Sequence, residues 1–240
     1  MQSTSKNLKD KIALALDFSR EEEVIAFLSQ LNPKPKVLKI GLELTSSVGI
    51  LCALELVNQL CPESEIFLDL KLHDIPNTIS KSVEALSNLK YKIKFLTLHS
   101  LGGSKMLEEA LNASKNSLNI VAVTVLTSHS NESIQKDFPR ITDFTLPAFS
   151  SDLVRMAYQA GVRWFVSSAN EARMLKKQFS EIKLITPGIR LKKIDNDDQS
   201  RVMTPVEALK AGSDLLVIGR PIYKAENPQL EWNNLIHSLN

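Results

Sequence analysis

The sequence has little cysteine and no long apolar run. Cys52 and Cys61 are its only two cysteines, and they form no Cys-x-x-Cys pair. We therefore expect inert, packed thiols in a reducing cytoplasm. No apolar run approaches the roughly 18 to 20 residues of a membrane span, and residues 1–10 are polar, unlike a signal peptide. These absences predict a cytoplasmic protein without a membrane anchor.

An excess of charge of one sign is also missing. The chain has 29 lysines and arginines against 27 aspartates and glutamates, which leaves a formal net charge of +2. Proteins that bind nucleic acid usually carry a basic stripe interleaved with aromatic side chains, and no such stripe is visible. The composition therefore favours neither nucleic acid nor an anionic membrane as a partner. A local group of basic residues can still bind a phosphate.

What the chain does have is a repeated alternation of short apolar runs and longer amphipathic stretches. This alternation predicts parallel strands joined by helices. Eight such units favour a closed (β/α)8 TIM barrel, and the absence of a Pro/Gly/Ser-rich linker favours a single domain over residues 1–240. An open doubly wound sheet is the alternative, although no GxGxxG follows the first run. The runs are Ile12–Leu16, Val37–Leu42, Ile66–Leu70, Ile93–Leu98, Ile120–Leu126, Arg163–Val166, Ile182–Ile185 and Asp214–Ile218. The helix-like segments include Arg20–Leu31, Ser47–Leu60, Ile75–Leu89, Ser104–Ser114 and Leu153–Ala160, and the longest irregular stretches are 127–146 and 187–203.

Charged residues interrupt the first three apolar runs at regular positions. Successive residues of a strand face opposite sides, and both faces of a parallel barrel are buried. Alternation therefore turns four charges toward the barrel interior, near the carboxyl ends of the strands, where barrel enzymes assemble their active sites. These charges are Asp17, Lys39, Asp69 and Lys71, which share the inner face with Ala13, Ala15 and Phe67. The residues expected to face the helices are Leu38, Ile40, Leu42, Ile66, Leu68 and Leu70.

The simplest explanation of such charges is a buried salt bridge that only joins the strands. Desolvation can cancel the Coulomb gain of such a pair, so four charges at the open end of a barrel favour a functional site instead. Asp74 follows the third strand and adds a carboxylate. Alternating carboxylates and ammonium groups keep one another ionised. An array of this kind can place a fixed negative charge against a substrate, while an ammonium group beside it donates a proton.

Two glycine-containing turns follow the seventh and eighth runs. They read Thr186-Pro187-Gly188-Ile189-Arg190 and Gly219-Arg220-Pro221. Glycine lets backbone N–H groups approach an anion, and arginine offers a bidentate partner. The loops after strands seven and eight, with a helix N-terminus nearby, form the usual phosphate site of this barrel, and Pro221 suits the first turn of such a helix. An isolated turn of this kind would carry no function, but two in the expected places predict a phosphate site.

The residues around these positions resemble a known family. The segment Phe67-Leu-Asp-Leu-Lys-Leu-His-Asp-Ile-Pro-Asn-Thr78 is similar to the signature of the orotidine 5′-phosphate decarboxylases, in particular of the short bacterial type. Further matches are Ala15–Asp17, Leu38–Gly41, Leu98–Gly103, Val123–Ser128, Thr186–Arg190, Asp197–Pro205 and Val217–Ile222. The resemblance implies a homodimer of barrels that uses no metal and no cofactor. It would convert orotidine 5′-monophosphate to UMP and CO2 in de novo pyrimidine biosynthesis.

The resemblance also implies a role for each matching residue. Asp17 and Lys39 would contact the ribose, Asp69 would lie against the substrate carboxylate, and Lys71 would protonate C6. The catalytic set would be Lys39, Asp69, Lys71 and Asp74. Ile75 and Thr78 would bind the substrate and, with Asp74, reach the neighbouring subunit's site. Thr127 would contact the pyrimidine, and Gln199 would lie between phosphate and base. Gly219 and Arg220 would hold the phosphate, with Pro187 and Arg190 bordering it.

Two other functions compete with this one. Related sugar-phosphate barrels, such as 3-keto-L-gulonate 6-phosphate decarboxylase, share the Asp-x-Lys-x-x-Asp pattern but bind Mg2+ through carboxylates, and they have an acid where Lys39 stands. A catalytically silent phosphate-binding scaffold is the other alternative, although every charged position of the array is filled. His99 matches a polar family position but receives no step, and a satisfied structural histidine is the alternative. His73 and His129 receive no role.

Overall fold

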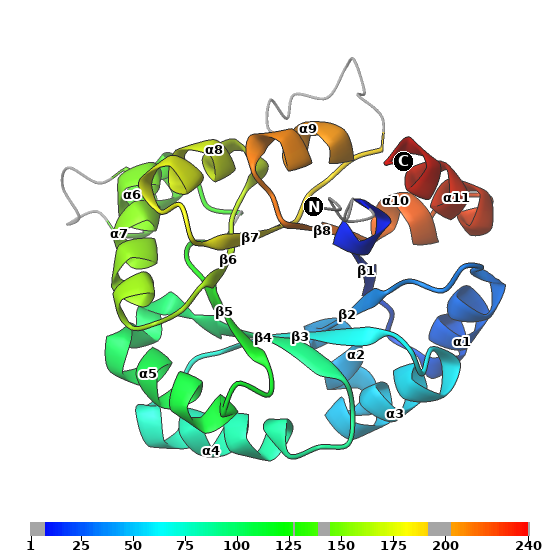
Figure 1. The fold of residues 1–240 in the computed structure, drawn as a ribbon, viewed down its shortest axis with the longest axis horizontal. Helices are drawn as coiled ribbons and strands as arrows, with labels where there is room; N and C mark the ends of the chain where they lie inside the picture. Colours follow the sequence, from blue (N-terminus) through cyan, green and yellow to red (C-terminus); the bar gives the residue numbers. More distant parts are fainter. Residues whose placement is uncertain (1–7, 127, 139–144, 192–202, 240) are drawn as a thin grey trace, which may run out of the picture.

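The computed structural model describes residues 8–126, 128–138, 145–191 and 203–239, and these form a closed barrel of parallel strands in the order β1 to β8. Figure 1 shows the strands around the centre with the helices arranged outside them. The predicted (β/α)8 TIM barrel is confirmed. The strands are β1 Ile12–Leu16, β2 Val37–Gly41, β3 Glu65–Leu72, β4 Ile93–His99, β5 Asn119–Val123, β6 Trp164–Val166, β7 Lys183–Thr186 and β8 Leu215–Ile218.

The helices connect successive strands and cover the outside of the barrel (Figure 1). No helix in the described ranges is long and apolar enough to cross a membrane. The helices are α1 Glu21–Gln30, α2 Leu42–Val48, α3 Ile50–Leu60, α4 Pro76–Ser87, α5 Gly103–Ser114, α6 Asn131–Asp137, α7 Leu146–Gln159, α8 Ala169–Gln178, α9 Pro205–Ala211, α10 Arg220–Tyr223 and α11 Pro228–Ser238, with 3-10 helices η1 Leu8–Lys11 and η2 Ser100–Gly102.

Several expected boundaries are wrong. Leu42 was expected to end a strand and face the helices, but it begins α2 and is 53% exposed. The expected helix Ser47–Leu60 is divided at Gly49, whose φ of +86° is a left-handed conformation that suits glycine. β5 ends at Val123 rather than Leu126. The expected irregular stretch 127–146 contains α6, which begins with a reciprocal Ser130–Ser133 capping box.

The two cysteines differ in environment. Both are free; Cys61 is buried at the end of α3, whereas Cys52 is exposed on the same helix. The expectation of two packed thiols is therefore wrong for Cys52, because the two residues lie on different faces of the helix.

The alternation of strand residues separates two apolar cores. The inner core fills the base of the barrel and includes Phe67 and Phe95, whose ring centroids are 5.8 Å apart. Trp164 packs edge-on against Phe95 at 4.8 Å. The outer core lies between strands and helices, and it contains the expected residues Leu38, Ile40, Ile66, Leu68 and Leu70. Because aromatic side chains close the base, the inner charges can meet only above them, at the carboxyl ends of the strands.

One strand pair departs from regular pairing. Leu68 of β3 pairs with Leu96 of β4, but the next pair joins Leu72 to Leu98, so β3 contains extra residues within this interval. Lys71 lies in the interval and has a φ of +49°, in the left-handed region. Bulges of this type re-aim side chains and occur often beside active sites.

Candidate active site

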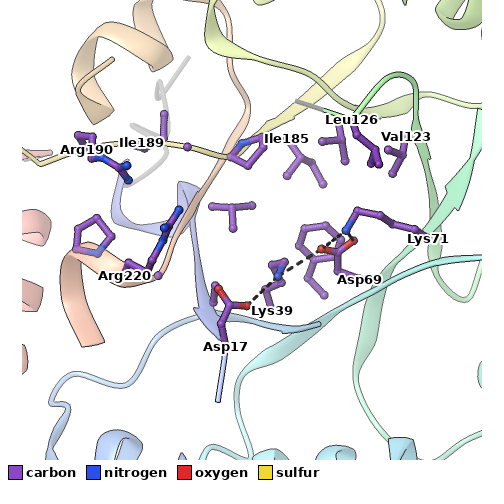
Figure 2. Close-up of a pocket in the computed structure, with 18 of the residues that line it drawn as sticks. Asp17, Lys39, Asp69, Lys71, Val123, Leu126, Ile185, Ile189, Arg190 and Arg220 are labelled. Atoms are coloured by element: carbon purple, nitrogen blue, oxygen red, sulfur yellow. Dashed lines mark hydrogen bonds and ion pairs between the residues drawn. The ribbon is translucent and has the colours of Figure 1, made fainter. Parts of the chain in front are cut away.

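A cavity of about 270 Å³ opens at the carboxyl ends of the strands. Its lining combines the charged residues of the first three βα units with the turns after β7 and β8. Figure 2 shows Arg190 and Arg220 on one side of the cavity and the pair Asp69–Lys71 on the opposite side. An elongated ligand with an anionic end can therefore reach both groups at once.

The inner charges form a continuous chain of ion pairs. Lys39 Nζ lies 3.3 Å from Asp17 Oδ1 and 3.3 Å from Asp69 Oδ2. Lys71 Nζ lies 2.8 Å from Asp69 Oδ1 and 2.9 Å from Asp69 Oδ2 (Figure 2). The structure thus brings together the four charges that strand alternation assigned to one face, in the order Asp17, Lys39, Asp69, Lys71.

Asp69 is the most enclosed member of this chain, with a side chain that is 10% exposed. Burial by itself raises the pKa of this carboxyl group, but the cations Lys39 and Lys71, with hydrogen bonds from Lys71 and Thr97, hold the pKa below its usual value. Asp69 is therefore ionised at neutral pH. A substrate carboxylate brought beside it meets a fixed negative charge.

Thr97 is a contact of this group that sequence reasoning missed. It lies on β4, its exposed fraction is 0%, and its hydroxyl donates to Asp69 Oδ1 at 3.0 Å. The Thr97 hydroxyl oxygen also accepts a hydrogen bond from the backbone N–H of Lys71 at 2.8 Å. A signal was available, because strand alternation places Thr97 on the same face as Phe95, one step closer to the carboxyl end.

The cavity also has an apolar wall that sequence reasoning did not identify. Val123 ends β5 and Leu126 lies in the segment after it, while Ile185 and Ile189 come from β7 and the turn after it. Figure 2 shows these side chains above the charged group. Binding sites for small molecules are usually mostly apolar with a few polar groups that fix orientation. The wall suits the faces of a planar ring.

The predicted anion turns both line the cavity. Gly188 has a φ of +77°, which requires the turn to contain glycine, and Arg190 follows it. A Cβ atom at Gly219 would lie 3.0 Å from the Cβ of Ala15 and 3.2 Å from Cε1 of Tyr223, so a side chain there would be crowded. Because glycine has no side chain, the backbone at Gly219 can approach a ligand closely, and Arg220 begins the short helix α10 beside it.

Other predicted site residues lie elsewhere. Asp74, Ile75 and Thr78 are exposed at the start of α4 and do not line the cavity. Asp74 Oδ1 accepts the N–H of Ile75 at 2.6 Å. Thr127 and Gln199 lie outside the described residues.

His99 lies at the end of β4, close to the charged group. Its ring stacks on that of His73 at 5.6 Å, and its buried Nδ1 has no hydrogen-bond partner among the described residues, unlike a satisfied structural histidine. Burial, followed by the nearby His73 and Lys71, lowers the pKa of His99.

No group of three or more His, Cys, Asp and Glu side chains suited to a metal ion occurs in the part of the chain that the structure describes.

A closed parallel barrel with an ionised array and two arginine-bearing turns at its carboxyl rim belongs to the class of phosphate-binding barrel enzymes. The chain matches the model of the orotidine 5′-phosphate decarboxylase / HUMPS family over residues 10–235, and it belongs to that family.

Curated relatives and solved structures agree with this assignment. The chain is 39% identical to an orotidine 5′-phosphate decarboxylase of Legionella pneumophila (strain Corby), with 95% of this chain and 99% of the relative covered. It is 43% identical to that of Tolumonas auensis, with 91% and 93% covered. The crystal structure of orotidine 5′-phosphate decarboxylase from Lactobacillus acidophilus is similar, with a TM-score of 0.79, 30% identity, and 95% and 98% of the two chains covered.

Proposed function

We propose that the chain decarboxylates orotidine 5′-monophosphate to UMP and CO2 in pyrimidine biosynthesis, the activity named for its curated relatives. The observation that carries the proposal is the contact between Asp69 and Lys71 at the wall of the cavity, with 2.8 Å between Lys71 Nζ and Asp69 Oδ1. A fixed carboxylate beside an ammonium is the arrangement that loss of CO2 followed by protonation requires.

The substrate is placed by its two ends. The phosphate lies at Arg190 and Arg220, where guanidinium groups and the backbone at Gly219 meet the cavity. The ribose then lies beside Asp17 and Lys39, on the way to the opposite side of the cavity. The pyrimidine packs on the apolar wall, with its carboxylate at Asp69 and its C6 atom near Lys71. Pro187 borders the phosphate.

The chemical step breaks the bond between C6 and the carboxylate carbon. The electron pair of that bond stays on C6 as CO2 leaves, and the ring π-system cannot absorb it. Lys71 stabilises the developing charge and then donates an ammonium proton to C6, and solvent returns a proton to the amine. The preorganised ammonium costs no reorganisation at that moment, because Asp69 already holds it in place.

Asp69 acts on the ground state. Its ionised carboxylate repels the substrate carboxylate, and the repulsion disappears when neutral CO2 leaves. Arg190 and Arg220 lie across the cavity from Asp69 (Figure 2). Their attraction for the phosphate offsets this repulsion on binding. Interactions remote from the reacting carbon thus contribute to the rate.

The proposal includes a homodimer in the cytoplasm, made of single-domain chains that span residues 1–240 and use no metal or cofactor. Asp74, Ile75 and Thr78 would enter the site of the neighbouring subunit. In support, all three are exposed at the start of α4 and none lines the cavity of its own chain. By the resemblance, Thr127 would contact the pyrimidine and Gln199 would link phosphate and base, with Lys39 and Asp74 completing the catalytic set.

A spectrophotometric assay tests the function. Loss of the orotate absorbance of orotidine 5′-monophosphate should continue unchanged after EDTA treatment. Lys71→Ala should slow it by about 100- to 1000-fold or more, the effect of removing a main transition-state contact. Lys92→Ala is the matched control, because Lys92 forms an exposed ion pair with Glu63 and does not line the cavity. Strict dependence on Mg2+, or turnover of 3-keto-L-gulonate 6-phosphate instead, would overturn the proposal.

A further inference from the structure

Thr97 is in contact with both members of the proposed catalytic pair. Its hydroxyl donates a hydrogen bond to Asp69 Oδ1 at 3.0 Å and accepts one from the backbone N–H of Lys71 at 2.8 Å. The polarity of this bridge is fixed, because an ionised carboxylate only accepts and a backbone N–H only donates. Thr97 itself is fully buried and does not line the cavity. It therefore acts on a substrate only through Asp69 and Lys71.

The second of these bonds replaces regular strand pairing. Between the pairs Leu68–Leu96 and Leu72–Leu98 the β3–β4 ladder is irregular, and Lys71 lies within this interval. Its φ of +49° is uncommon for a residue with a side chain, and such conformations persist where the surroundings hold them. The Thr97 hydroxyl is the acceptor that holds the Lys71 backbone here. The direction of the Lys71 side chain follows from that backbone.

The first bond fixes the carboxylate. Asp69 Oδ1 receives both the Thr97 hydroxyl and Lys71 Nζ, while Oδ2 lies against Lys39 Nζ at 3.3 Å. Lys71 Nζ also lies 2.9 Å from Oδ2, so both carboxylate oxygens are in contact with donors that favour this orientation. Loss of the hydroxyl would remove one hydrogen bond from the buried Asp69 carboxylate and leave the backbone N–H of Lys71 without its acceptor.

We propose that Thr97 is a positioning residue of this reaction, whose single hydroxyl aligns the Asp69 carboxylate with the Lys71 ammonium and holds the left-handed backbone of Lys71. The inference rests on the proposed roles of Asp69 and Lys71. It assigns the alignment of the pair to a residue of the next strand, β4, rather than to β3 alone.

The charges that face Asp69 predict a particular pH effect. Lys39 approaches from β2 and Lys71 from β3, while Asp17, after β1, pairs with Lys39. On β4, His99 is close enough to Lys71 for the charge of Lys71 to contribute to the lowered pKa of the imidazole. Removing the Thr97 hydroxyl leaves all these charges in place but takes one hydrogen bond from the ionised form of Asp69. The pKa of Asp69 then rises, and the acidic limb of the kcat profile moves to higher pH.

The test compares Thr97→Val, Thr97→Ser and Ser64→Ala. Thr97→Val should lower kcat by about 10- to 100-fold, the range for a hydrogen bond to a charged group, with KM changed less than about threefold and the acidic limb displaced upward. Thr97→Ser, which keeps the hydroxyl, should restore most of both. If Thr97→Val does not fold, Thr97→Ala has the same expected result.

Ser64→Ala is the control for the loss of a buried hydroxyl. Ser64 is buried just before β3, at the end of the strand away from Asp69 and Lys71, and its hydroxyl donates to the backbone carbonyl of Pro35 at 2.5 Å. It should lose stability without a change in kcat or in the pH profile. A normal profile in Thr97→Val, or the same displacement in Ser64→Ala, would overturn the positioning role. If Lys71→Ala retains turnover, the proposed mechanism fails instead, so the two failures are distinguishable.

Discussion

Lys39 and Asp69 come from neighbouring strands, and Lys39 Nζ lies 3.3 Å from Asp69 Oδ2 inside the barrel mouth. The side chains are 14% and 10% exposed, so water screens the pair only weakly. Lys39 also lies 3.3 Å from Asp17 Oδ1. The ammonium therefore links the part of the site assigned to the ribose with the part assigned to the reacting carbon.

Lys39→Met should raise the pKa of Asp69, because burial then has one less cation to oppose it. The acidic limb of the kcat/KM profile should move to higher pH, and kcat/KM at neutral pH should fall by about 10- to 100-fold. Steady-state assays across pH measure both effects. Lys36→Met is the control, because Lys36 pairs with Asp10 in an exposed position. An unchanged acidic limb would show that Lys39 does not set the charge of Asp69.

Arg220→Ala should weaken binding of the substrate phosphate. We expect kcat/KM for orotidine 5′-monophosphate to fall by about 10- to 100-fold, the value of one charge-assisted contact. The rate with orotidine, which has no phosphate, should hardly change. Arg155→Ala is the control, since Arg155 forms an exposed ion pair with Asp152 on α7. Equal losses with both substrates would place Arg220 away from the phosphate.

Two inactive variants should recover activity in a mixed dimer if Asp74 contributes to the active site of the neighbouring subunit. In a mixed dimer of Lys71→Ala and Asp74→Ala chains, one site lacks both residues and the other has both. Activity should therefore reappear on co-expression, at up to about half of the wild-type rate per mixed dimer. Differently tagged chains allow the mixed dimer to be purified and assayed. Failure to recover activity in a verified mixed dimer would place Asp74 in its own chain's site.

His99 should remain neutral at pH 7. Burial, then His73 and Lys71, lowers its pKa from the ordinary 6.5. The unfolded chain then binds a proton at higher pH than the folded chain does, so this contribution to stability is present above pH 6.5 and is lost as pH falls from there toward the folded pKa. NMR titration of the ring gives the pKa directly. Urea unfolding of His99→Asn should show a weaker decline below pH 6.5, and an equal decline would contradict the assignment.

Local sequence patterns were enough to predict the barrel and its inner charges. The period of two in the first three strands turned Asp17, Lys39 and Asp69 to one face, because that period follows from the pleat of the strand itself. The arginine-bearing turns were recognisable because glycine and the position after strands seven and eight are both local signals.

Tertiary structure decided what depends on register and on distant segments. Thr97 meets Asp69 and Lys71 only because β3 and β4 pair irregularly between Leu68 and Leu72, and no local pattern encodes that pairing. The apolar wall likewise comes from strands far apart in the sequence. The sequence by itself determined which charges face the interior, since that follows from the backbone repeat of each strand. Only the closed barrel determined their distances, because these depend on how neighbouring strands are staggered.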